Sequence, residues 1–182
     1  MKQPQKSEVS LDSQIIQLKP VGVVRNQSKD FRWGGALNAK DWRNRAAKMK
    51  EQGESTSELV IDSSLDGILD GIEDFSHIRV LYWAHLGPQW RSSTTRFHPM
   101  GNKDFPLVGV FATESPMRPN PILTSVVRLV ERRGNVLRVT GLDALDGSPI
   151  LDIKPYYTNP QELNDIRIPE WMREIHHEFT ED

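Results

Sequence analysis

One stretch of the sequence places an arginine and an asparagine among closely spaced prolines. Arg118 and Asn120 are separated by Pro119 and flanked by Pro116 and Pro121. Each proline fixes its own φ and restricts the residue before it, so this stretch should form a stiff bend between two strands. A stiff bend presents its side chains with little ordering cost when a ligand binds. Arg118 could offer a guanidinium fork to a carboxylate or phosphate, and Asn120 an amide to a base edge or the backbone. A rigid structural crossover, whose arginine pairs with a local carboxylate, fits the same pattern.

A second group of candidate residues runs from a turn into a short strand. The sequence Asp146 to Pro149 has the composition of an Asp-Gly turn, which by itself explains the first two residues. Asp152 and Lys154 follow, two residues apart in the strand expected over 149–155, and Tyr156 continues their side. Because side chains alternate along a strand, this polar face either meets water or lines a polar pocket.

Several common sites lack their sequence signatures. The chain has no cysteine, which excludes disulfides, thiolate zinc sites and cysteine nucleophiles. It contains no G-x-G-x-x-G, P-loop or H-E-x-x-H motif, so a Rossmann or P-loop nucleotide site has no fingerprint here. His176 and His177 are adjacent, and one helix face cannot present both rings to one metal. His77, His85 and His98 are dispersed, and we expect no metal site.

The charged residues are distributed unevenly, although the net charge is only −2. Residues 25–50 are strongly basic, and residues 51–74 carry acidic side chains and no basic ones. The two segments could simply be solvated, or the basic one could be a mobile arm that finds phosphates. If RNA is the partner, the candidate phosphate contacts are Arg25, Arg32, Arg43, Arg45, Lys48 and Arg96.

Most expected elements are short strands separated by turns. Hydrophobic patterning predicts strands over 15–25, 58–62, 78–86, 107–113, 122–132, 136–142 and 149–155. It also predicts short helices over 64–72 and 169–179, and one that begins at Asn38 or Asp41 and runs to about Gln52. This order predicts a mainly β fold, a small barrel or sandwich with short peripheral helices, outside the Rossmann class.

The expected domain organisation is one β domain with two appendages. We expect a disordered lead-in over 1–14, the domain over 15–160 with a long basic insertion at 26–57, and an acidic extension over 161–182. No apolar run approaches the roughly 20 residues of a membrane helix, and the first 12 residues lack a signal-peptide pattern. The sequence therefore predicts a cytoplasmic protein without a membrane partner.

Five segments together resemble the TsaA-like family, whose bacterial members are the TrmO tRNA methyltransferases. They are Gly22–Arg25, Ile72–Ile78, Gly109–Thr113, Arg118–Ile122 and Leu145–Tyr156. The last two are long and unusual in composition, which makes a chance match improbable. The resemblance implies a closed or partly open β-barrel, a homodimer, and S-adenosylmethionine (SAM) bound outside the Rossmann class. The implied reaction is methyl transfer to the exocyclic amine of the threonylcarbamoyl-adenosine beside the tRNA anticodon.

The resemblance also suggests where the cofactor binds: at the end of the 78–86 strand, around the proline-rich bend and on the Asp-Gly turn. The candidate cofactor-binding residues are His85, Leu86, Phe111, Glu114, Arg118, Asn120, Thr124, Asp146, Gly147, Ser148 and Pro149. Aromatic faces favour a sulfonium, and Phe111, Tyr82 and Tyr156 are candidates. The candidate catalytic residues are Asp152, Lys154 and Tyr156; Asp152 or Asp146 could accept the proton of the attacking amine.

Two positions depart from the family pattern. Glu114 stands where the family usually has arginine before Ser-Pro, and Leu123 stands where it usually has glycine after Pro-Asn-Pro-Ile. The first change replaces a cation with an anion, and the second removes a residue that allows close backbone approach. Two alternatives therefore remain open: a SAM-dependent methyltransferase acting on a small molecule or another RNA, and a non-catalytic SAM-binding or RNA-binding module.

Overall fold

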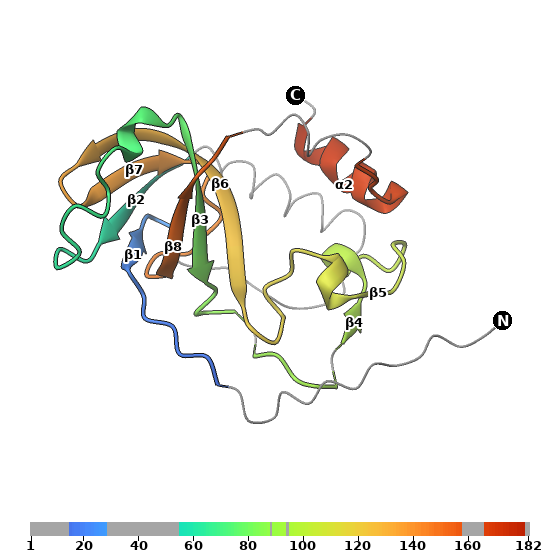
Figure 1. Ribbon diagram of the computed structural model, residues 1–182. Helices are drawn as coiled ribbons and strands as arrows, with labels where there is room; N and C mark the ends of the chain where they lie inside the picture. Colours follow the sequence, from blue (N-terminus) through green and yellow to red (C-terminus); the bar gives the residue numbers. More distant parts are fainter. Residues whose placement is uncertain (1–14, 29–54, 88, 94, 158–165, 181–182) are drawn as a thin grey trace.

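The computed structural model describes residues 15–28, 55–87, 89–93, 95–157 and 166–180 of the chain. Its centre is a closed antiparallel barrel, in which neighbouring strands follow the order β1-β2-β7-β6-β3-β8 (Figure 1). The strands are β1 Gly22–Arg25, β2 Thr56–Ile61, β3 His77–Trp83, β6 Ile122–Arg133, β7 Val136–Thr140 and β8 Pro149–Pro155. The predicted mainly β fold and barrel are confirmed.

The interior of the barrel is filled by alternate residues of its strands. In β3, Ile78, Val80 and Tyr82 are buried while the residues between them point outward, as the alternation in the sequence predicts. The other strands contribute in the same way, and the buried core includes Val24, Leu59, Ile61, Val127, Leu137, Val139 and Ile150. Each such side chain stabilises the fold by about 1.5–3 kcal/mol relative to an exposed one.

Two glycines allow close packing or tight turning in the barrel. A Cβ on Gly22 would lie 2.5 Å from the carbonyl oxygen of Val60, so only glycine lets β1 approach β2 this closely. Gly134 lies at φ 60 in the turn that joins β6 to β7. The pairing of β3 with β8 shifts register between Leu81 and Tyr82, which re-aims the start of β8 relative to the rest of that strand.

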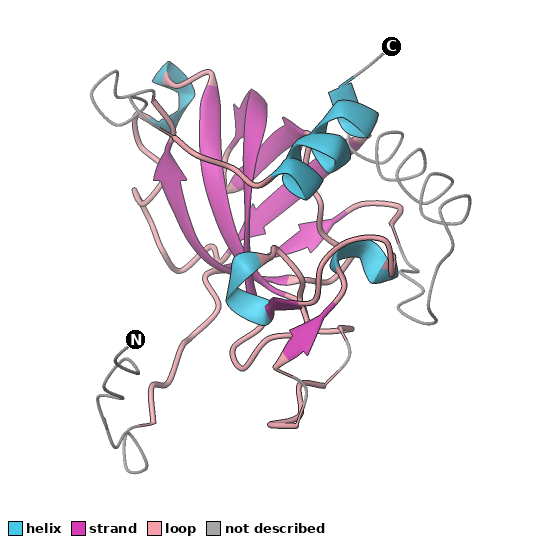
Figure 2. Cartoon of the chain, turned by 90° about the vertical axis from the view of Figure 1, so that its right-hand side faces the viewer, coloured by secondary structure: helices cyan, strands magenta, loops and turns pink. Residues whose placement is uncertain are grey.

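A smaller unit lies beside the barrel. The short strands β4 (Arg96–Phe97) and β5 (Val108–Gly109) pair with each other, and short helical turns flank them, η2 at Pro99–Gly101 and η3 at Val110–Ala112 (Figure 2). The helix α2 (Glu170–Thr180) lies on the same side of the barrel (Figure 1). Buried Phe105 and Ile175, with Met100 and Trp171 packed against them, form a second apolar cluster that joins α2 to this unit.

Several expected elements differ from the structure. The helix expected over 64–72 is a series of turns, because Gly67 and Gly71 adopt φ values of 73 and 81, and only the 3-10 turn η1 (Ile72–Asp74) follows. The strand expected over 15–25 begins only at Gly22, because the residues of this segment that pair with β2 and β8 are those of Gly22–Arg25. The strand expected over 107–113 shortens to β5 and continues as η3. The expected helix over 41–52 lies outside the described residues, whereas that over 169–179 is confirmed as α2.

Two further findings concern the described residues only. None of their helices has the length and apolar composition that crossing a membrane requires. They also contain no group of three or more histidine or acidic side chains arranged to hold a metal ion.

Candidate functional site

The end of β3 meets the Asp-Gly turn at His85. The His85 Nδ1 and the Ser148 Oγ are 3.3 Å apart and share a hydrogen bond. Ser148 is buried, with 2% of its surface exposed, whereas His85 is exposed. A Cβ on Gly147 would lie 3.5 Å from His85 Nε2, so the ring also lies against the backbone of the turn. These contacts join two regions that the sequence places 63 residues apart.

The turn is held in place by the segment that leaves β1. The backbone N–H of Asn26 donates to Asp146 Oδ1 (3.1 Å), and the Asn26 side-chain amide donates to the carbonyl of Ala144 (2.9 Å). The backbone N–H groups of Asp146 and Gly147 donate to the carbonyls of Ser28 and Val24. Because so many bonds fix it, the turn is preorganised, and Gly147 supplies the left-handed backbone (φ 80) that it requires.

Arg118 fixes the conformation of the proline-rich bend. Its Nε donates to the carbonyl of Ser115 (3.0 Å) and its Nη2 to the carbonyl of Thr113 (2.6 Å). The arginine therefore binds local backbone carbonyls, which differs from the carboxylate partner expected of a structural crossover. A guanidinium carries five N–H donors, and these two bonds leave the others for an anion.

The bend lies directly beside the end of β3. The N–H of Ala84 donates to the carbonyl of Pro121 (2.9 Å). A Cβ on Gly87 would lie 3.7 Å from the Cβ of Pro116. The segment from Ala84 to Gly87 thus contacts the bend on one side and, through His85, the Asp-Gly turn on the other.

The hydroxyl of Tyr82 marks a second place where the two regions converge. It donates to the backbone carbonyl of Asp143 and lies 3.4 Å from the Ser125 Oγ. Burial raises the pKa of Tyr82, and the carboxylates of Asp143 and Glu114 raise it further. Since Glu114 begins the bend and Asp143 precedes the turn, both regions bring an acidic group within electrostatic range of one hydroxyl.

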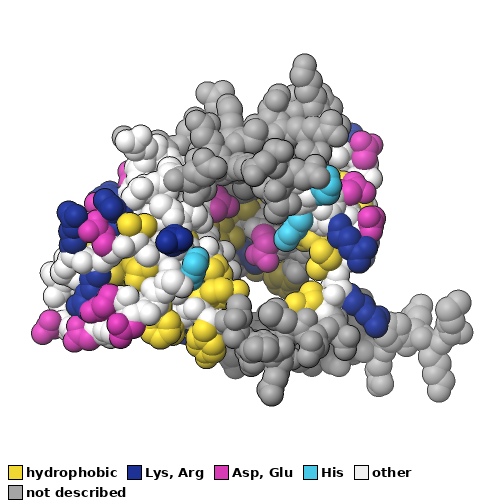
Figure 3. All heavy atoms as spheres, turned by 90° about the horizontal axis from the view of Figure 1, so that it is seen from above, with side chains coloured by type: hydrophobic (Ala, Val, Ile, Leu, Met, Phe, Trp, Pro, Cys, Tyr) yellow, Lys and Arg dark blue, Asp and Glu magenta, His cyan; other side chains and the backbone are white. Residues whose placement is uncertain are grey.

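Asp143 combines exposure with loss of hydration. Its side chain reaches solvent, yet the protein around it desolvates the carboxylate and raises its pKa. Seen from above, the described surface is hollowed between the barrel and the part that contains α2, with hydrophobic, acidic and histidine side chains around the hollow (Figure 3).

The candidate catalytic residues lie on the outer face of the barrel. Thr124 of β6 and Asp152 of β8 pair with the same β3 residue, Leu81, on opposite sides. The Lys154 Nζ is 2.6 Å from the Asp152 Oδ2, so these two side chains face the same way and pair with each other. The ring of Tyr156 lies under the guanidinium of Arg79, whose carbon is 5.6 Å from the ring centroid.

The remaining predicted residues lie at several places in the fold. Tyr82 has 2% of its surface exposed inside the barrel, so the expectation that its ring could face a sulfonium is wrong. Phe111, at 81% exposure, is available for that role. The other predicted positions are exposed Leu86, Glu114 and Asn120, Pro149 at the start of β8, Arg25 opposite Glu58, and Arg96 opposite Gly109. Arg32, Arg43, Arg45 and Lys48 lie outside the described residues.

Sequence patterns did not identify Asn26 or Asp143. Asn26 holds the Asp-Gly turn, and the backbone carbonyl of Asp143 accepts the hydrogen bond of the Tyr82 hydroxyl. The only local signal was a polar residue at the end of an apolar strand, in each case. Leu123 also gains an explanation, because it pairs with Tyr82 and packs against the barrel core.

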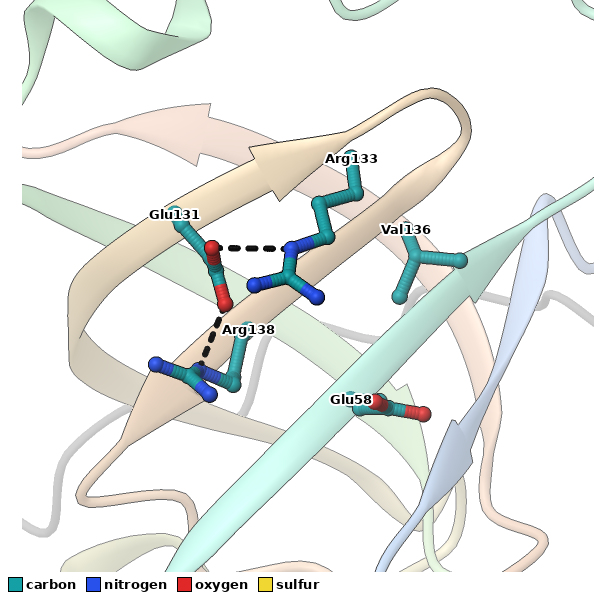
Figure 4. A pocket seen from close by; sticks show the side chains of 5 residues that line it. All are labelled: Glu58, Glu131, Arg133, Val136 and Arg138. Carbon is teal, nitrogen blue, oxygen red and sulfur yellow. Dashed lines mark hydrogen bonds and ion pairs between the residues drawn. The ribbon is translucent and has the colours of Figure 1, made fainter.

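A separate surface pocket of about 50 Å³ lies on the outer face of β2, β7 and β6 (Figure 4). Glu131 dominates it by pairing with Arg133 (2.9 Å) and Arg138 (3.0 Å). None of the predicted catalytic or cofactor-binding residues lines it, and its cations are engaged by its own carboxylate. We therefore do not place the chemistry there.

Comparison with known proteins adds a family and a structural match. Residues 43–161 match the family of the tRNA-methyltransferase O N-terminal domain. A probable S-adenosyl-L-methionine-binding protein of Methanothermobacter thermautotrophicus is 41% identical over 148 residues, which cover 81% of this chain and 95% of that protein. A mouse tRNA (adenine(37)-N6)-methyltransferase is 37% identical over 99 residues, or 53% of this chain and 22% of that protein. The crystal structure of TrmO from Pseudomonas aeruginosa matches with a TM-score of 0.61 and 27% identity; the match covers 89% of this chain and 64% of that one.

Proposed function

This chain belongs to the tRNA-methyltransferase O N-terminal domain family, and on that premise we propose that it is a SAM-dependent methyltransferase acting on tRNA. The proposed acceptor is the exocyclic N6 amine of adenosine 37 in its threonylcarbamoyl form. The mouse relative is named for methylation at that position, and the archaeal relative is named for SAM binding. Because the chain spans less than two thirds of the TrmO crystal structure, the activity of that whole protein remains a proposal here.

The observation that carries the proposal is the contact between the end of β3 and the Asp-Gly turn, beside the proline-rich bend. His85, Gly147 and Ser148 meet there, and Pro116 adjoins the same segment through Gly87. These groups suit the chemistry of SAM. The N–H groups of the turn donate to carbonyls of the protein, so its backbone would meet the adenine edge through carbonyl oxygens. The N–H groups of Arg118 beyond those bonded to Ser115 and Thr113 can bind the methionine carboxylate. The exposed ring of Phe111 can lie against the sulfonium.

The protein's own contribution to methyl transfer is mainly alignment. SAM, when bound, supplies an activated methyl group, and an in-line displacement depends on how well the amine is held opposite it. The turn and the bend are both fixed by internal hydrogen bonds, so little ordering remains to be done on binding. Asp152 or Asp146 would accept the proton that the amine releases, directly or through water.

A methylation assay tests the proposal. Purified protein is incubated with SAM carrying a labelled methyl group and with tRNA that contains or lacks threonylcarbamoyl-adenosine. Nucleoside mass spectrometry should then show N6-methylated threonylcarbamoyl-adenosine only in the first tRNA. Label that stays in SAM with both tRNAs, while calorimetry shows SAM binding, would contradict the proposed reaction.

A second candidate keeps the SAM site and changes the acceptor or removes the catalytic step. Glu114 favours it, because the family usually has an arginine at this position. Here the carboxylates of Glu114 and Asp143 both lie near the Tyr82 hydroxyl. An acidic environment suits a different acceptor from one that carries a carboxylate of its own, as threonylcarbamoyl-adenosine does. Labelled methyl transfer to small-molecule amines or to other RNA, without transfer to tRNA, would support a different acceptor. SAM binding without transfer to any of them would support a binding module.

The proposed assembly and location complete the functional picture. We propose that the protein acts as a cytoplasmic homodimer that needs no metal ion. Size-exclusion chromatography with light scattering measures the oligomeric state, and activity in the presence of a chelator tests whether a metal ion is needed.

A further inference from the structure

The outer face of β6, β3 and β8 carries cations in unusual positions. Arg79 of β3 lies directly opposite Lys154 of β8, and His77 of β3 lies directly opposite Arg128 of β6. All four point outward, because they alternate with the buried residues of their strands. We call Arg79, Arg128, Lys154, His77 and Tyr156 the basic face.

This arrangement works against folding. Arg79 and Lys154 carry like charges directly opposite each other on neighbouring strands, and such a pair destabilises a sheet. Lys154 turns to Asp152, and Arg79 lies over the ring of Tyr156, so each is partly relieved. Within the described part of the chain, neither Arg79 nor Arg128 has a carboxylate partner, and both are exposed. A face with exposed arginines that find no carboxylate among the described residues is suited to an anion from outside the protein.

The surroundings of these cations indicate which anion. The Arg79 guanidinium lies over the Tyr156 ring, 5.6 Å from its centroid, and we call this pair the platform. Exposed Val126 (42%) lies directly opposite Arg79 on the other side. Tyr157, at 74% exposure, follows at the end of β8. Flat aromatic and guanidinium surfaces among cations are typical of sites that bind RNA phosphates and stack unpaired bases. A small anion would need the cations but not the platform.

We propose that the basic face binds the phosphate backbone of the RNA substrate and stacks one unpaired base on the Arg79–Tyr156 platform. This inference rests on the proposed function and adds a substrate-binding surface to it. Arg79 lies within β3, which ends at Trp83, and the chain turns directly after it, where the His85 N–H donates to the carbonyl of Trp83. Six residues span at most roughly 20 Å, so Arg79 and His85 lie within that distance of each other. One strand therefore connects the RNA-binding face to the site at which the base is methylated, and RNA bound along it would reach both.

Substitution of Arg79 and Arg128 tests this inference. The variants are Arg79→Gln, Arg128→Gln and the double variant, and the control is Arg173→Gln, which removes an exposed arginine of α2. Fluorescence anisotropy measures the affinity for total tRNA between 50 and 300 mM salt. Each lost phosphate contact should reduce the slope of log K against log salt by about 0.7–0.9, which is roughly a five- to eightfold loss of affinity at 0.1 M salt. The control should keep the wild-type slope.

The outcomes separate this inference from the proposed function. Affinity and slope in the double variant equal to those of the wild type, or equal losses in Arg173→Gln, would overturn the inference even if the wild type methylates tRNA. Failure of the wild type to bind RNA would overturn it as well. Conversely, a wild type that binds tRNA through these arginines but transfers no methyl group would contradict the proposed reaction and leave the RNA-binding face intact. Calorimetric SAM affinity, expected to be unchanged in all variants, verifies folding.

Discussion

Replacement of Gly147 by alanine separates the structural role of the Asp-Gly turn from its proposed role in cofactor binding. Gly147 has φ 80, and an added Cβ would lie 3.5 Å from His85 Nε2, an ordinary van der Waals contact. The methyl group therefore fits but covers one side of the turn. Gly71 has φ 81 and nothing within 4 Å of an added Cβ, and it lies before β3, at the opposite end of that strand from His85. Gly71→Ala is thus a control with the same backbone strain and no site contact.

The structure allows the two effects to be estimated separately. A left-handed backbone costs an L-residue roughly 1–2 kcal/mol, and the lower entropy of the unfolded alanine chain offsets about 0.4–1 kcal/mol of it. A net loss of about 1 kcal/mol should lower Tm by about 2–4 °C in a chain of this size, equally in both variants. At the site, a blocked hydrogen bond between the turn and SAM is worth about 0.5–1.5 kcal/mol, or roughly a twofold to tenfold loss of affinity in Gly147→Ala alone.

Circular dichroism measures Tm, and isothermal titration calorimetry measures the Kd for SAM. If both variants bind SAM like the wild type while their Tm values fall, the turn is not part of the cofactor site. If Gly147→Ala keeps the wild-type Tm while Gly71→Ala does not, the assumption that backbone strain dominates at Gly147 is wrong.

Three further substitutions test other parts of the site. Tyr82→Phe should reduce the free energy of unfolding by about 1–3 kcal/mol, because it leaves the carbonyl of Asp143 without its buried donor. Urea denaturation measures this free energy, and unchanged stability would mean that water replaces the hydroxyl. Asp143→Asn should stabilise the protein at neutral pH and not below pH 3.8. The native pKa of Asp143 lies above 3.8, so its protonated carboxyl contributes its full stability below that pH. This contribution is lost as the pH rises through the native pKa, and asparagine avoids the loss. Unfolding free energies at pH 3 and pH 7 measure the difference, and a variant that is equally stable or less stable at pH 7 would contradict it. Asp152→Asn should lower the rate of methyl transfer more than SAM affinity, and a calorimetric loss of SAM binding by folded protein would instead make Asp152 a cofactor ligand.

The parts of the fold that sequence patterns predicted best are those with strong local signals. The strand over 149–155 has the predicted bounds, because Asp146-Gly147 marks its start and alternation continues through it. Outward Arg79 and inward Val80 in β3 follow from the same alternation. The helix expected at 64–72 does not form. The prediction relied on the helical spacing of its apolar residues, but Gly67 and Gly71 adopt left-handed backbones, which end a helix.

Contacts within the candidate site could not be predicted, because they join distant parts of the chain. The Asn26 backbone and the Asp146 carboxylate are 120 residues apart, and no periodicity relates them. Patterns did identify the turn and the bend as two rigid segments. Only the closure of the barrel between β1 and β8 brings the segment after β1 beside the turn. The raised pKa of Asp143 likewise depends on the protein packed around it, which desolvates the carboxylate.

The two departures from the family pattern have different consequences in three dimensions. Leu123 pairs with Tyr82 and packs against the barrel core, so its larger side chain fills space inside the barrel. It therefore gives no reason to expect weaker cofactor binding. Glu114 is exposed and, with Asp143, adds negative potential around the Tyr82 hydroxyl, where the bend and the turn converge. Because this change alters charge at that position, it bears on the acceptor in the proposed reaction, whereas the contacts of His85, Gly147 and Ser148 bear on the proposed SAM site.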